Sequence, residues 1–210
     1  SKVEGLKRYL INKMLFLGEK ILFKKKMTIL ERIENQICEK LVRRKIKSQF
    51  GGSLKAFISG GGALDKGVGV FLNAIGLPTL QGYGLTETSP VVSCNPIHDI
   101  RIDTVGPAFK ENDVKIAEDG EILIKGENVM LGYWNNEEAT NKAFINKDDK
   151  LWYKTGDSGK VEDGFLFFDG RISENYKLSN GKFVSVSRVE NNIRKYLKSN
   201  FFLGDFNNLI

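Results

Sequence analysis

Two glycine-rich stretches carry most of the residues of this chain that could bind a ligand. The decapeptide QGYGLTETSP contains, in order, two glycines around an aromatic ring, then a hydroxyl and a carboxylate: Gly82, Tyr83, Gly84, Thr86 and Glu87. Glycines let a backbone wrap closely around a planar or charged group, because they have no side chain in the way. A nucleotide site would need these groups. A plain turn in which Thr86 caps the next element would explain them too, so both interpretations stay open for this stretch alone.

The second stretch is LKAFISGGGALD, residues 54–65. A short apolar strand is followed by Gly60, Gly61 and Gly62, and Asp65 then stands where it could cap a helix that reaches about Ile75. Strand, glycine loop and helix in this order are typical of an α/β fold, and PTLQGYG predicts another buried strand that ends at the decapeptide. Ligands of open parallel sheets bind beyond the carboxyl ends of the strands. We therefore expect the two glycine loops to line one crevice.

Composition excludes several kinds of chemistry. The 210 residues, 41% of them hydrophobic, are enough for one or two domains with a real core. His98 is the only histidine, which excludes most Ser/His/Asp, Cys/His and multi-histidine metal sites. Cys38 and Cys94 have no CxxC partner, so we expect small buried hydrophobic residues in a reducing compartment. Catalysis by this chain would therefore depend on carboxylates, lysines, hydroxyls and backbone amides.

The first 50 residues combine positive charge with helical periodicity. The chain carries a net charge of +6, and its lysines and arginines crowd this segment. Apolar residues recur at helical intervals, which predicts two or three helices; the most regular set has steps of four: Ile29, Ile33, Ile37 and Leu41. The favoured interpretation places the apolar face in the core and the basic face in solvent. The alternative is peripheral contact of LINKMLFLGEKILFKKK with an anionic membrane.

Partners and location follow from the same features. We expect no nucleic acid, because the basic segment has few aromatic residues at stacking spacing and contains no recognised binding motif. No apolar run approaches the ~20 residues that span a bilayer, and the start does not resemble a signal peptide. We therefore expect a cytoplasmic protein, or one peripheral on a cytosol-facing membrane.

After Ser93 the pattern changes to short alternating strands. DVKI, EILIKG, KLWYKTGD, GKVEDGFLFFDGR and KLSNGKFVSV predict strands separated by Asp-Gly and Asn-Gly turns, and NNEEATNKAF predicts one short helix. Helical spacing returns from residue 189 to residue 197. The predicted fold class is α/β, with a mixed sheet and its helices followed by an antiparallel β subdomain.

Four of these stretches, taken together and in this order, resemble the adenylate-forming superfamily of acyl-CoA synthetases, luciferases and adenylation domains: SGGG (59–62), YGLTET (83–88), GEILIKGENVMLGYW (120–134), and YKTGD (153–157) followed by DGRISENYKLSNGKFV (169–184). Within it, FGGSLKAFISGGGAL and KLSNGK are most similar to long-chain fatty acyl-CoA synthetases. The resemblance covers about residues 49–190. It implies that residues 1–170 are the C-terminal part of the large AMP-binding domain. Residues 171–210 would then be the hinge and an incomplete small C-terminal α+β domain.

The resemblance also implies a reaction. Such enzymes join a fatty acid to ATP, which gives an acyl-adenylate and pyrophosphate, and then transfer the acyl group from AMP to coenzyme A, with Mg²⁺ as the metal. A medium-chain or aryl-CoA ligase and an adenylation domain remain alternatives, as does a non-catalytic membrane-surface module. The family's upstream phosphate loop and downstream catalytic lysine do not occur in these residues. We therefore expect an internal fragment of a synthetase without adenylation activity of its own.

Site residues follow by position from the resemblance. Gly60, Gly61, Gly62, Gly82 and Gly84 would form the backbone around the nucleotide. Tyr83 would lie against adenine, Thr86 would donate to the α-phosphate and Glu87 would bind Mg²⁺. Asp157 would accept from both ribose hydroxyls and Arg171 would reinforce it, so Tyr83 and Asp157 are expected to bind one adenylate.

Three further positions concern the second half-reaction and the strand framework. Lys177 matches a lysine near the thiolation site, although a solvated hairpin lysine explains it equally well. The hinge position, commonly Asp or Lys in relatives, falls at Ser173, where a serine backbone could still rotate. The block at Glu121, Gly132 and Tyr133 is interpreted as structural.

Overall fold

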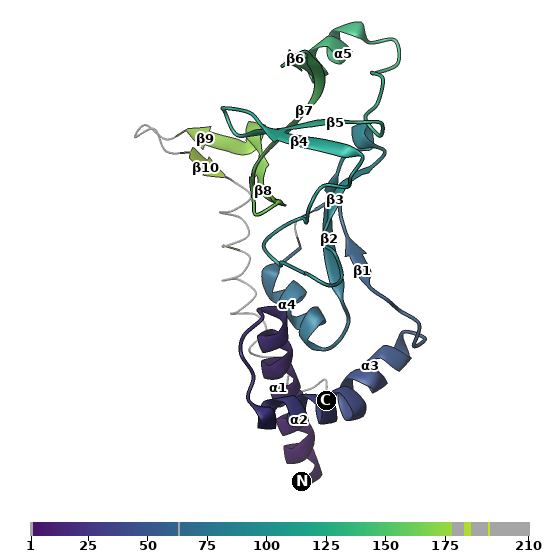
Figure 1. The fold of residues 1–210 in the computed structure, drawn as a ribbon, viewed down its shortest axis with the longest axis vertical. Coiled ribbons are helices and arrows are strands. Elements are labelled where there is room, and N and C mark those ends of the chain that lie inside the picture. Colours follow the sequence, from purple (N-terminus) through teal and green to yellow (C-terminus); the bar gives the residue numbers. More distant parts are fainter. Residues whose placement is uncertain (1, 63, 178–182, 186–192, 194–210) are drawn as a thin grey trace. The chain divides into compact units, whose positions relative to one another are not determined.

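The computed structural model of the chain describes residues 2–62, 64–177, 183–185 and 193. Figure 1 draws this fold as a ribbon coloured along the sequence. The chain divides into two compact units. Unit 1 comprises residues 1–112, 127–130 and 163–166, and unit 2 comprises residues 113–126, 131–162 and 167–210.

Unit 1 begins with the predicted helices. They are α1 (Lys2–Leu22), α2 (Ile29–Cys38) and α3 (Arg44–Gln49), with a π-helical segment η1 (Glu39–Arg43) joining the last two. α2 begins at Thr28, whose hydroxyl accepts from the Glu31 amide at 3.2 Å while the Glu31 carboxylate accepts from the Thr28 amide at 2.8 Å. This capping box satisfies two amides that the first turn would otherwise leave unpaired. Among the described residues, no helix combines the length and the apolar character that crossing a bilayer requires.

The helices of unit 1 share a small apolar core. Met14 and Leu17 of α1 pack with Cys38, Ile75 and Leu77, and all five are buried. Burial of Cys38 confirms its prediction as a small buried residue, whereas Cys94 is only partly buried. Burial also raises the pKa of the Cys38 thiol, so at neutral pH it stays protonated and is a poor nucleophile.

One cation is buried against this core. Arg43 is 4% exposed, and its guanidinium donates to the carbonyls of Ala74 at 3.0 Å and Met14 at 3.1 Å. A third bond reaches the Asn35 side-chain oxygen at 2.7 Å. A charge is tolerated away from water only when its donors are satisfied in this way. Arg43 therefore ties α1, α2 and the end of α4 (Lys66–Ala74) together.

The predicted burial of the four-residue repeat is wrong. The exposed fractions of Ile29, Ile33, Ile37 and Leu41 are 78%, 51%, 44% and 50%. α2 contacts α1 through its polar side instead, because Glu31 pairs with Lys20 at 2.5 Å and the buried Cys38 joins the core. Periodicity identified an amphipathic helix correctly but not the face that the fold buries.

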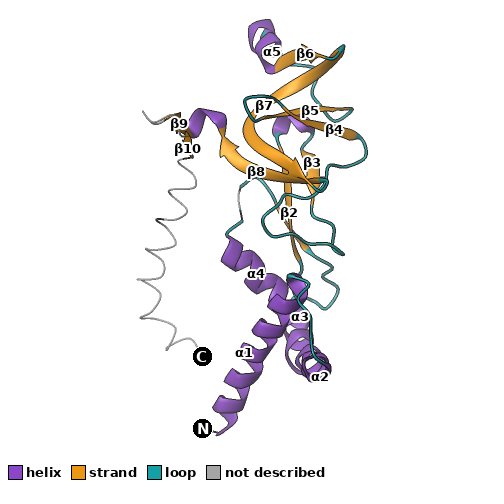
Figure 2. Ribbon diagram, turned by 60° about the vertical axis from the view of Figure 1, so that its left-hand side comes forward, coloured by secondary structure: helices purple, strands orange, loops and turns teal. Residues whose placement is uncertain are grey.

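The sheet of unit 1 contains β1 (Phe57–Ser59), β2 (Thr79–Gly84) and β3 (Val91–Cys94) in that order. β1 and β2 are parallel and are connected through α4, whereas β2 and β3 are antiparallel. The Asp65 carboxylate caps α4 by accepting from the Val68 amide at 3.0 Å. The predicted strand, glycine loop and capped helix are confirmed. Figure 2 shows α4 as a helix and β2 and β3 as strands.

A second sheet supplies most of unit 2. Its strands run in the order β4-β5-β7-β6, and β8 also pairs with β7. The elements are β4 (Asn112–Ile116), β5 (Glu121–Gly126), α5 (Glu137–Ala143), β6 (Phe144–Lys147), β7 (Lys150–Glu162) and β8 (Phe165–Arg171). The pairings of β5 with β7 and of β6 with β7 are antiparallel, as predicted for this region.

Beyond Arg171 the structure describes a short 3-10 turn, η3 (Ile172–Glu174), and one antiparallel hairpin of β9 (Asn175–Lys177) with β10 (Phe183–Ser185). The helix predicted from residue 189 to residue 197 lies outside the described residues, except for residue 193. The domain boundary predicted at residue 170 stays a prediction.

Candidate functional site

The first glycine loop leaves the sheet of unit 1 beside the second. β1 and β2 are in parallel register, with Ser59 opposite Gln81, so Gly60 comes next to Gly82. A Cβ atom placed on Gly60 would lie 3.9 Å from the Gly82 carbonyl oxygen. The two loops therefore begin side by side at the carboxyl ends of β1 and β2, and the crevice that they are expected to line stays a prediction.

This loop is open on its outer side. A Cβ atom on Gly61 or Gly62 would meet nothing within 4 Å. Gly61 also has a φ of +75°, in the left-handed region that favours glycine. The backbone angle of Gly61 thus explains why this position is glycine. At Gly62 no neighbouring atom of the described structure requires glycine.

The second loop begins within β2. Tyr83 is 8% exposed and lies opposite Ser93 of β3, and the register shifts immediately after it. A Cβ atom on Gly84 would lie 1.7 Å from the Pro90 carbonyl oxygen, which is impossible without moving backbone. Gly84 is therefore required by the close approach of residues 84 and 90, whatever role it has toward a ligand.

The hydroxyl and the carboxylate of the decapeptide lie on a 3-10 turn, η2 (Thr86–Thr88). Thr86 is exposed and Glu87 is half-buried. Thr88 is completely buried; its hydroxyl accepts from the Leu85 amide at 2.9 Å and lies 2.9 Å from the Pro90 carbonyl oxygen, to which it can donate. Thr88 thus fixes the turn that presents Thr86 and Glu87.

Asn128 is a second supporting residue, and no local sequence pattern indicates it. Its side-chain amide donates to the carbonyls of Thr88 at 2.7 Å and Val91 at 3.1 Å. Close by, the Met130 amide donates to the Glu87 carbonyl at 2.8 Å. A contact between residues 40 positions apart has no periodicity to reveal it. Residues 127–130 therefore position the turn that carries Glu87.

The magnesium role of Glu87 stays a prediction. Within the part of the chain that the structure describes, no three His, Cys, Asp or Glu residues are grouped so that they could hold a metal ion. Proteins commonly bind Mg²⁺ through one or two carboxylates, with substrate phosphates and water completing the octahedron. Glu87 could supply one such oxygen. When bound, the ion would neutralise phosphate charge.

Unit 2 contains the predicted ribose-binding pair. Asp157 is 2% exposed, and its Oδ1 lies 3.1 Å from Nε of Arg171. Arg171 Nη1 also donates to the Thr155 carbonyl at 3.1 Å. The Thr155 hydroxyl accepts from the Asp157 amide at 3.0 Å and donates to the Ile122 carbonyl at 2.7 Å. Two bonds to Thr155 thus position both members of the pair on β7 and β8.

The block interpreted as structural has structural contacts. The Glu121 carboxylate accepts from the Gly156 amide at 2.9 Å and so supports the loop before Asp157. A Cβ atom on Gly132 would lie 2.7 Å from Cγ2 of Thr140, whose hydroxyl accepts from the Tyr133 amide at 2.9 Å. These contacts agree with the interpretation.

The remaining predicted positions follow Arg171. Ser173 lies in the 3-10 turn directly after it and is exposed. Lys177 is the last residue of β9, opposite Phe183 in the hairpin. The hinge and thiolation roles stay predictions. The same holds for the joint binding of one adenylate by Tyr83 and Asp157, which belong to different units.

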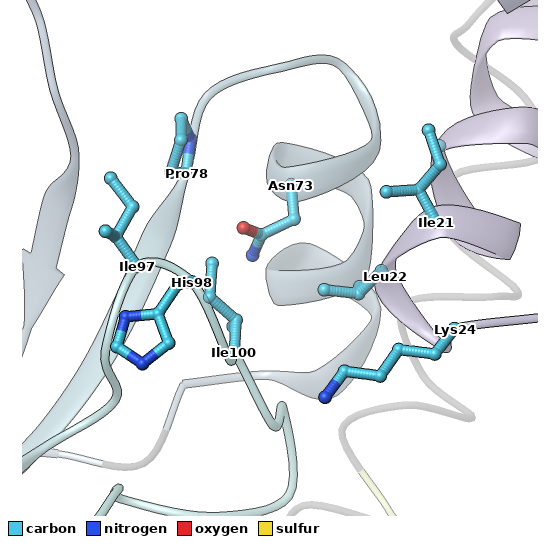
Figure 3. A pocket seen from close by; sticks show the side chains of 9 residues that line it. Ile21, Leu22, Lys24, Asn73, Pro78, Ile97, His98 and Ile100 are labelled. Carbon is cyan, nitrogen blue, oxygen red and sulfur yellow. The ribbon is translucent and has the colours of Figure 1, made fainter.

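A cavity of about 230 Å³ in unit 1 lies elsewhere (Figure 3). Pro78, which lines it, directly precedes β2, whereas Tyr83 and Gly84 end that strand. The other lining residues come from the end of α1, from α4 and from the segment after β3: Gly18, Ile21, Leu22, Lys24, Asn73, Ile97, His98 and Ile100. The sequence did not predict this cavity, and none of the predicted site residues lines it.

The cavity rim carries an ion pair. Lys24 Nζ lies 2.7 Å from Asp99 Oδ1. The hydrogen bond from Lys24 lowers the pKa of Asp99, with Arg101 as a further cation nearby. Asp99 is therefore an ionised carboxylate paired with Lys24.

Comparison with known proteins shows which family this chain is similar to. The sequence model of a family described as AMP-binding enzyme matches residues 25–134. The long-chain-fatty-acid–CoA ligase FadD15 of Mycobacterium bovis is 40% identical over 169 residues, which are 80% of this chain and 28% of that protein. The 2-succinylbenzoate–CoA ligase of Listeria innocua is 36% identical over 166 residues, 76% of this chain and 34% of that protein.

Solved structures of CoA ligases are also similar to this chain. The anthranilate CoA ligase AuaEII in complex with anthranoyl-AMP has a TM-score of 0.60 and 26% identity, covering 69% of this chain and 30% of that one. O-succinylbenzoate coenzyme A synthetase from Bacillus subtilis in complex with AMP has a TM-score of 0.58 and 28% identity, covering 69% and 33%. The chain thus spans about a third or less of the length of these relatives. The family match over residues 25–134, more than half of the chain, shows that this protein belongs to the AMP-binding enzymes.

Proposed function

We propose that this chain is the adenosine-binding part of a long-chain fatty acid–CoA ligase. The observation that carries the proposal is the pairing of Asp157 with Arg171 at 3.1 Å, at the two positions that match the family's ribose motif. A carboxylate with two oxygens is suited to a vicinal diol, and the guanidinium beside it fixes its orientation.

Unit 1 would supply the contacts to base and phosphate. The open space beside Gly61 and Gly62 suits the approach of a flat base. Thr86, exposed on its turn, would donate to the α-phosphate, where negative charge is redistributed during the reaction. Glu87 would contribute one oxygen to Mg²⁺, and Tyr83 would contact adenine at the end of β2.

The chemistry proposed for the whole ligase, to which this chain would contribute the adenosine-binding part, has two steps, and both conserve atoms. A fatty acid carboxylate oxygen attacks the α-phosphorus of ATP, so that an acyl–AMP anhydride forms as the bond to pyrophosphate breaks. The sulfur of coenzyme A then attacks the acyl carbon, so that a thioester forms, AMP leaves and the thiol proton goes to solvent or a base. Lys177 is the proposed contact for the second step.

The fatty acid is the finer part of the proposal. The 40% identity with a long-chain ligase over 80% of this chain supports it. The 36% identity with a 2-succinylbenzoate ligase and the similarity to an anthranilate ligase structure support an aryl acid as the second candidate.

Titration calorimetry with acyl-sulfamoyl adenosines, which mimic the acyl-adenylate, tests both parts. The 210-residue chain would be titrated with the hexadecanoyl, 2-succinylbenzoyl and anthraniloyl compounds and with AMP. We expect all to bind, and the hexadecanoyl compound to bind most tightly. Tightest binding of an aryl compound would overturn the substrate class alone, and absence of binding by all four would overturn the adenosine site.

A further inference from the structure

The outward face of α2 is a continuous apolar strip. Its members are isoleucines and leucines between 44% and 78% exposed: Ile29, Leu30, Ile33, Ile37 and Leu41. Steps of three and four keep Leu30, Ile33 and Ile37 on one face of the helix, and Leu41 continues the strip into the π-helical segment. We call these five residues the α2 apolar strip. Isolated apolar residues on a surface are ordinary, but a contiguous strip marks an interaction site.

The polar residues of α2 are used on the opposite side. Glu31 pairs with Lys20 at 2.5 Å, and Glu34 pairs with Lys13 at 2.9 Å, both on α1. Asn35 accepts from the buried Arg43. α2 therefore turns its carboxylates toward the protein and its apolar side chains away from it, the reverse of a helix that packs by its apolar face.

The other acidic side chains of residues 5–50 are also paired with lysines. Glu19 lies 3.8 Å from Lys25, and Glu39 lies 3.1 Å from Lys47. With Glu31 and Glu34, they are the four acidic residues between positions 5 and 50. All four thus have a lysine partner, so no unpaired carboxylate of residues 5–50 faces outward beside the strip.

Cations border the strip at a repeated spacing. Arg32, Lys40 and Arg44 each follow a member of the strip by three residues, which makes them its neighbours on the helix surface. All three are exposed, and none forms an ion pair with another described residue. Residues 1–50 hold fourteen Lys and Arg against five Glu, a net charge of +9, whereas the rest of the chain carries −3.

We propose that the α2 apolar strip docks on an anionic lipid surface. Isoleucine and leucine side chains would enter the boundary between headgroups and acyl chains, and Arg32, Lys40 and Arg44 would extend to the lipid phosphates. An anionic bilayer matches both properties of this face, apolar at its centre and positive at its border. The proposal concerns a surface of unit 1 and does not depend on the nucleotide assignments.

Other occupants match this face less well. A second copy of the chain would place one positive face against another, which is repulsive in a symmetric contact. Nucleic acid would match the cations but not the strip, because aliphatic side chains give no platform for stacking bases. The apolar centre and positive border thus favour a lipid partner over these two, and the dimer becomes an outcome of the test.

Vesicle flotation tests the proposal. The 210-residue chain would be mixed with phosphatidylcholine vesicles that contain or lack phosphatidylglycerol. The double variant Ile33→Glu/Ile37→Glu removes the centre of the strip, and Arg32→Gln/Lys40→Gln removes two border charges. The matched control is Val68→Glu/Phe71→Glu on α4, because its two residues are similarly exposed, at 45% and 49%. Circular dichroism and melting temperature would show that each variant keeps its fold.

We expect flotation with the anionic vesicles only, weakened by high salt. Ile33→Glu/Ile37→Glu should lower the partition coefficient about tenfold or more. Arg32→Gln/Lys40→Gln should lower the partition coefficient and reduce its salt dependence. The α4 control should leave the partition coefficient unchanged. Three results would overturn the proposal. The first is equal flotation of Ile33→Glu/Ile37→Glu and the unsubstituted chain, and the second is equal flotation with both vesicle types. The third is absence of vesicle binding together with a dimer, seen in sedimentation equilibrium, that the substitutions Ile33→Glu/Ile37→Glu dissociate.

Discussion

Asp157 and Arg171 form an ion pair in which the two side chains differ sharply in exposure. The Asp157 side chain is 3% exposed and that of Arg171 is 48% exposed, with 3.1 Å between Oδ1 and Nε. The carboxylate is thus held in place by an arginine that itself reaches solvent. A ligand that hydrogen-bonds to Asp157 would find its orientation already fixed, which lowers the entropy lost on binding.

Arg171→Lys tests whether the planar guanidinium of Arg171 is needed to hold Asp157 in the orientation that binds a ligand. Lysine keeps the charge but cannot contact Asp157 and the Thr155 carbonyl with one rigid planar group. We expect the affinity for an acyl-sulfamoyl adenosine to fall about tenfold. The free energy of unfolding should fall by at most about 1 kcal/mol, because the arginine is half exposed. Titration and scanning calorimetry measure the two effects. Unchanged affinity in a folded Arg171→Lys protein would argue against a positioning role for Arg171.

Arg43→Met should destabilise unit 1 by about 3 kcal/mol, because the carbonyls of Met14 and Ala74 and the Asn35 side chain would lose a buried donor. Urea denaturation followed by circular dichroism measures the loss. The matched control is Arg44→Met at the neighbouring exposed position, which should change stability by less than about 0.5 kcal/mol. Equal losses in the two variants would show that the three hydrogen bonds of Arg43 contribute little.

Glycines of the two loops should respond differently to alanine. Gly84→Ala places a Cβ atom 1.7 Å from a backbone oxygen, so we expect a loss of about 3 kcal/mol or more, or failure to fold. Gly62→Ala meets nothing within 4 Å and should keep its melting temperature, while affinity for AMP falls because the methyl group occupies the space proposed for adenine. A stable Gly84→Ala protein would contradict the packing described for β2 and residue 90. Full AMP affinity in Gly62→Ala would remove Gly62 from the adenine site.

Glu31 should make stability depend on pH. The Lys20 ammonium and then the Thr28 amide lower the pKa of the Glu31 carboxyl in the folded chain from its ordinary value of 4.5. The contribution of the ionised Glu31 to the free energy of unfolding is therefore complete above about pH 4.5, and it is lost as the pH falls through the lowered pKa of the folded state. The unfolding free energies of the chain and of Glu31→Gln should differ at neutral pH and converge in acid. Lys20→Met should cause a similar loss at neutral pH, and a Glu31→Gln difference that persists in strong acid would exclude the ion pair as its cause.

Local chemistry made much of the fold predictable. Asp65 before an apolar repeat predicted the start of α4, because a capping carboxylate acts within one turn. Three consecutive glycines after a strand predicted the loop at the edge of β1, and the alternation in EILIKG predicted a strand at Glu121–Gly126. The contact of Asp157 with Arg171 came from the family resemblance, since nothing local connects two residues on different strands.

The features that the sequence missed depend on distant parts of the chain. Periodicity at Ile33 and Ile37 cannot tell which side of α2 meets α1, and that choice follows from the pairs of Glu31 and Glu34 with lysines of α1. Asn128 supports the Glu87 turn across many residues. The cavity beside Pro78 likewise arises where α1, α4 and the segment after β3 meet, so no single stretch encodes it.

Asp157 is proposed to bind the ribose of an adenylate, and calorimetric titration of Asp157→Asn with hexadecanoyl-sulfamoyl adenosine tests this role. Asparagine keeps the shape but loses the charge and one acceptor, so affinity should fall about tenfold or more. The surface substitution Asp103→Asn, at a position paired only with Lys66 in the described structure, should leave affinity unchanged. Equal affinities of the chain and of folded Asp157→Asn protein, or no binding by the unsubstituted chain, would contradict the account.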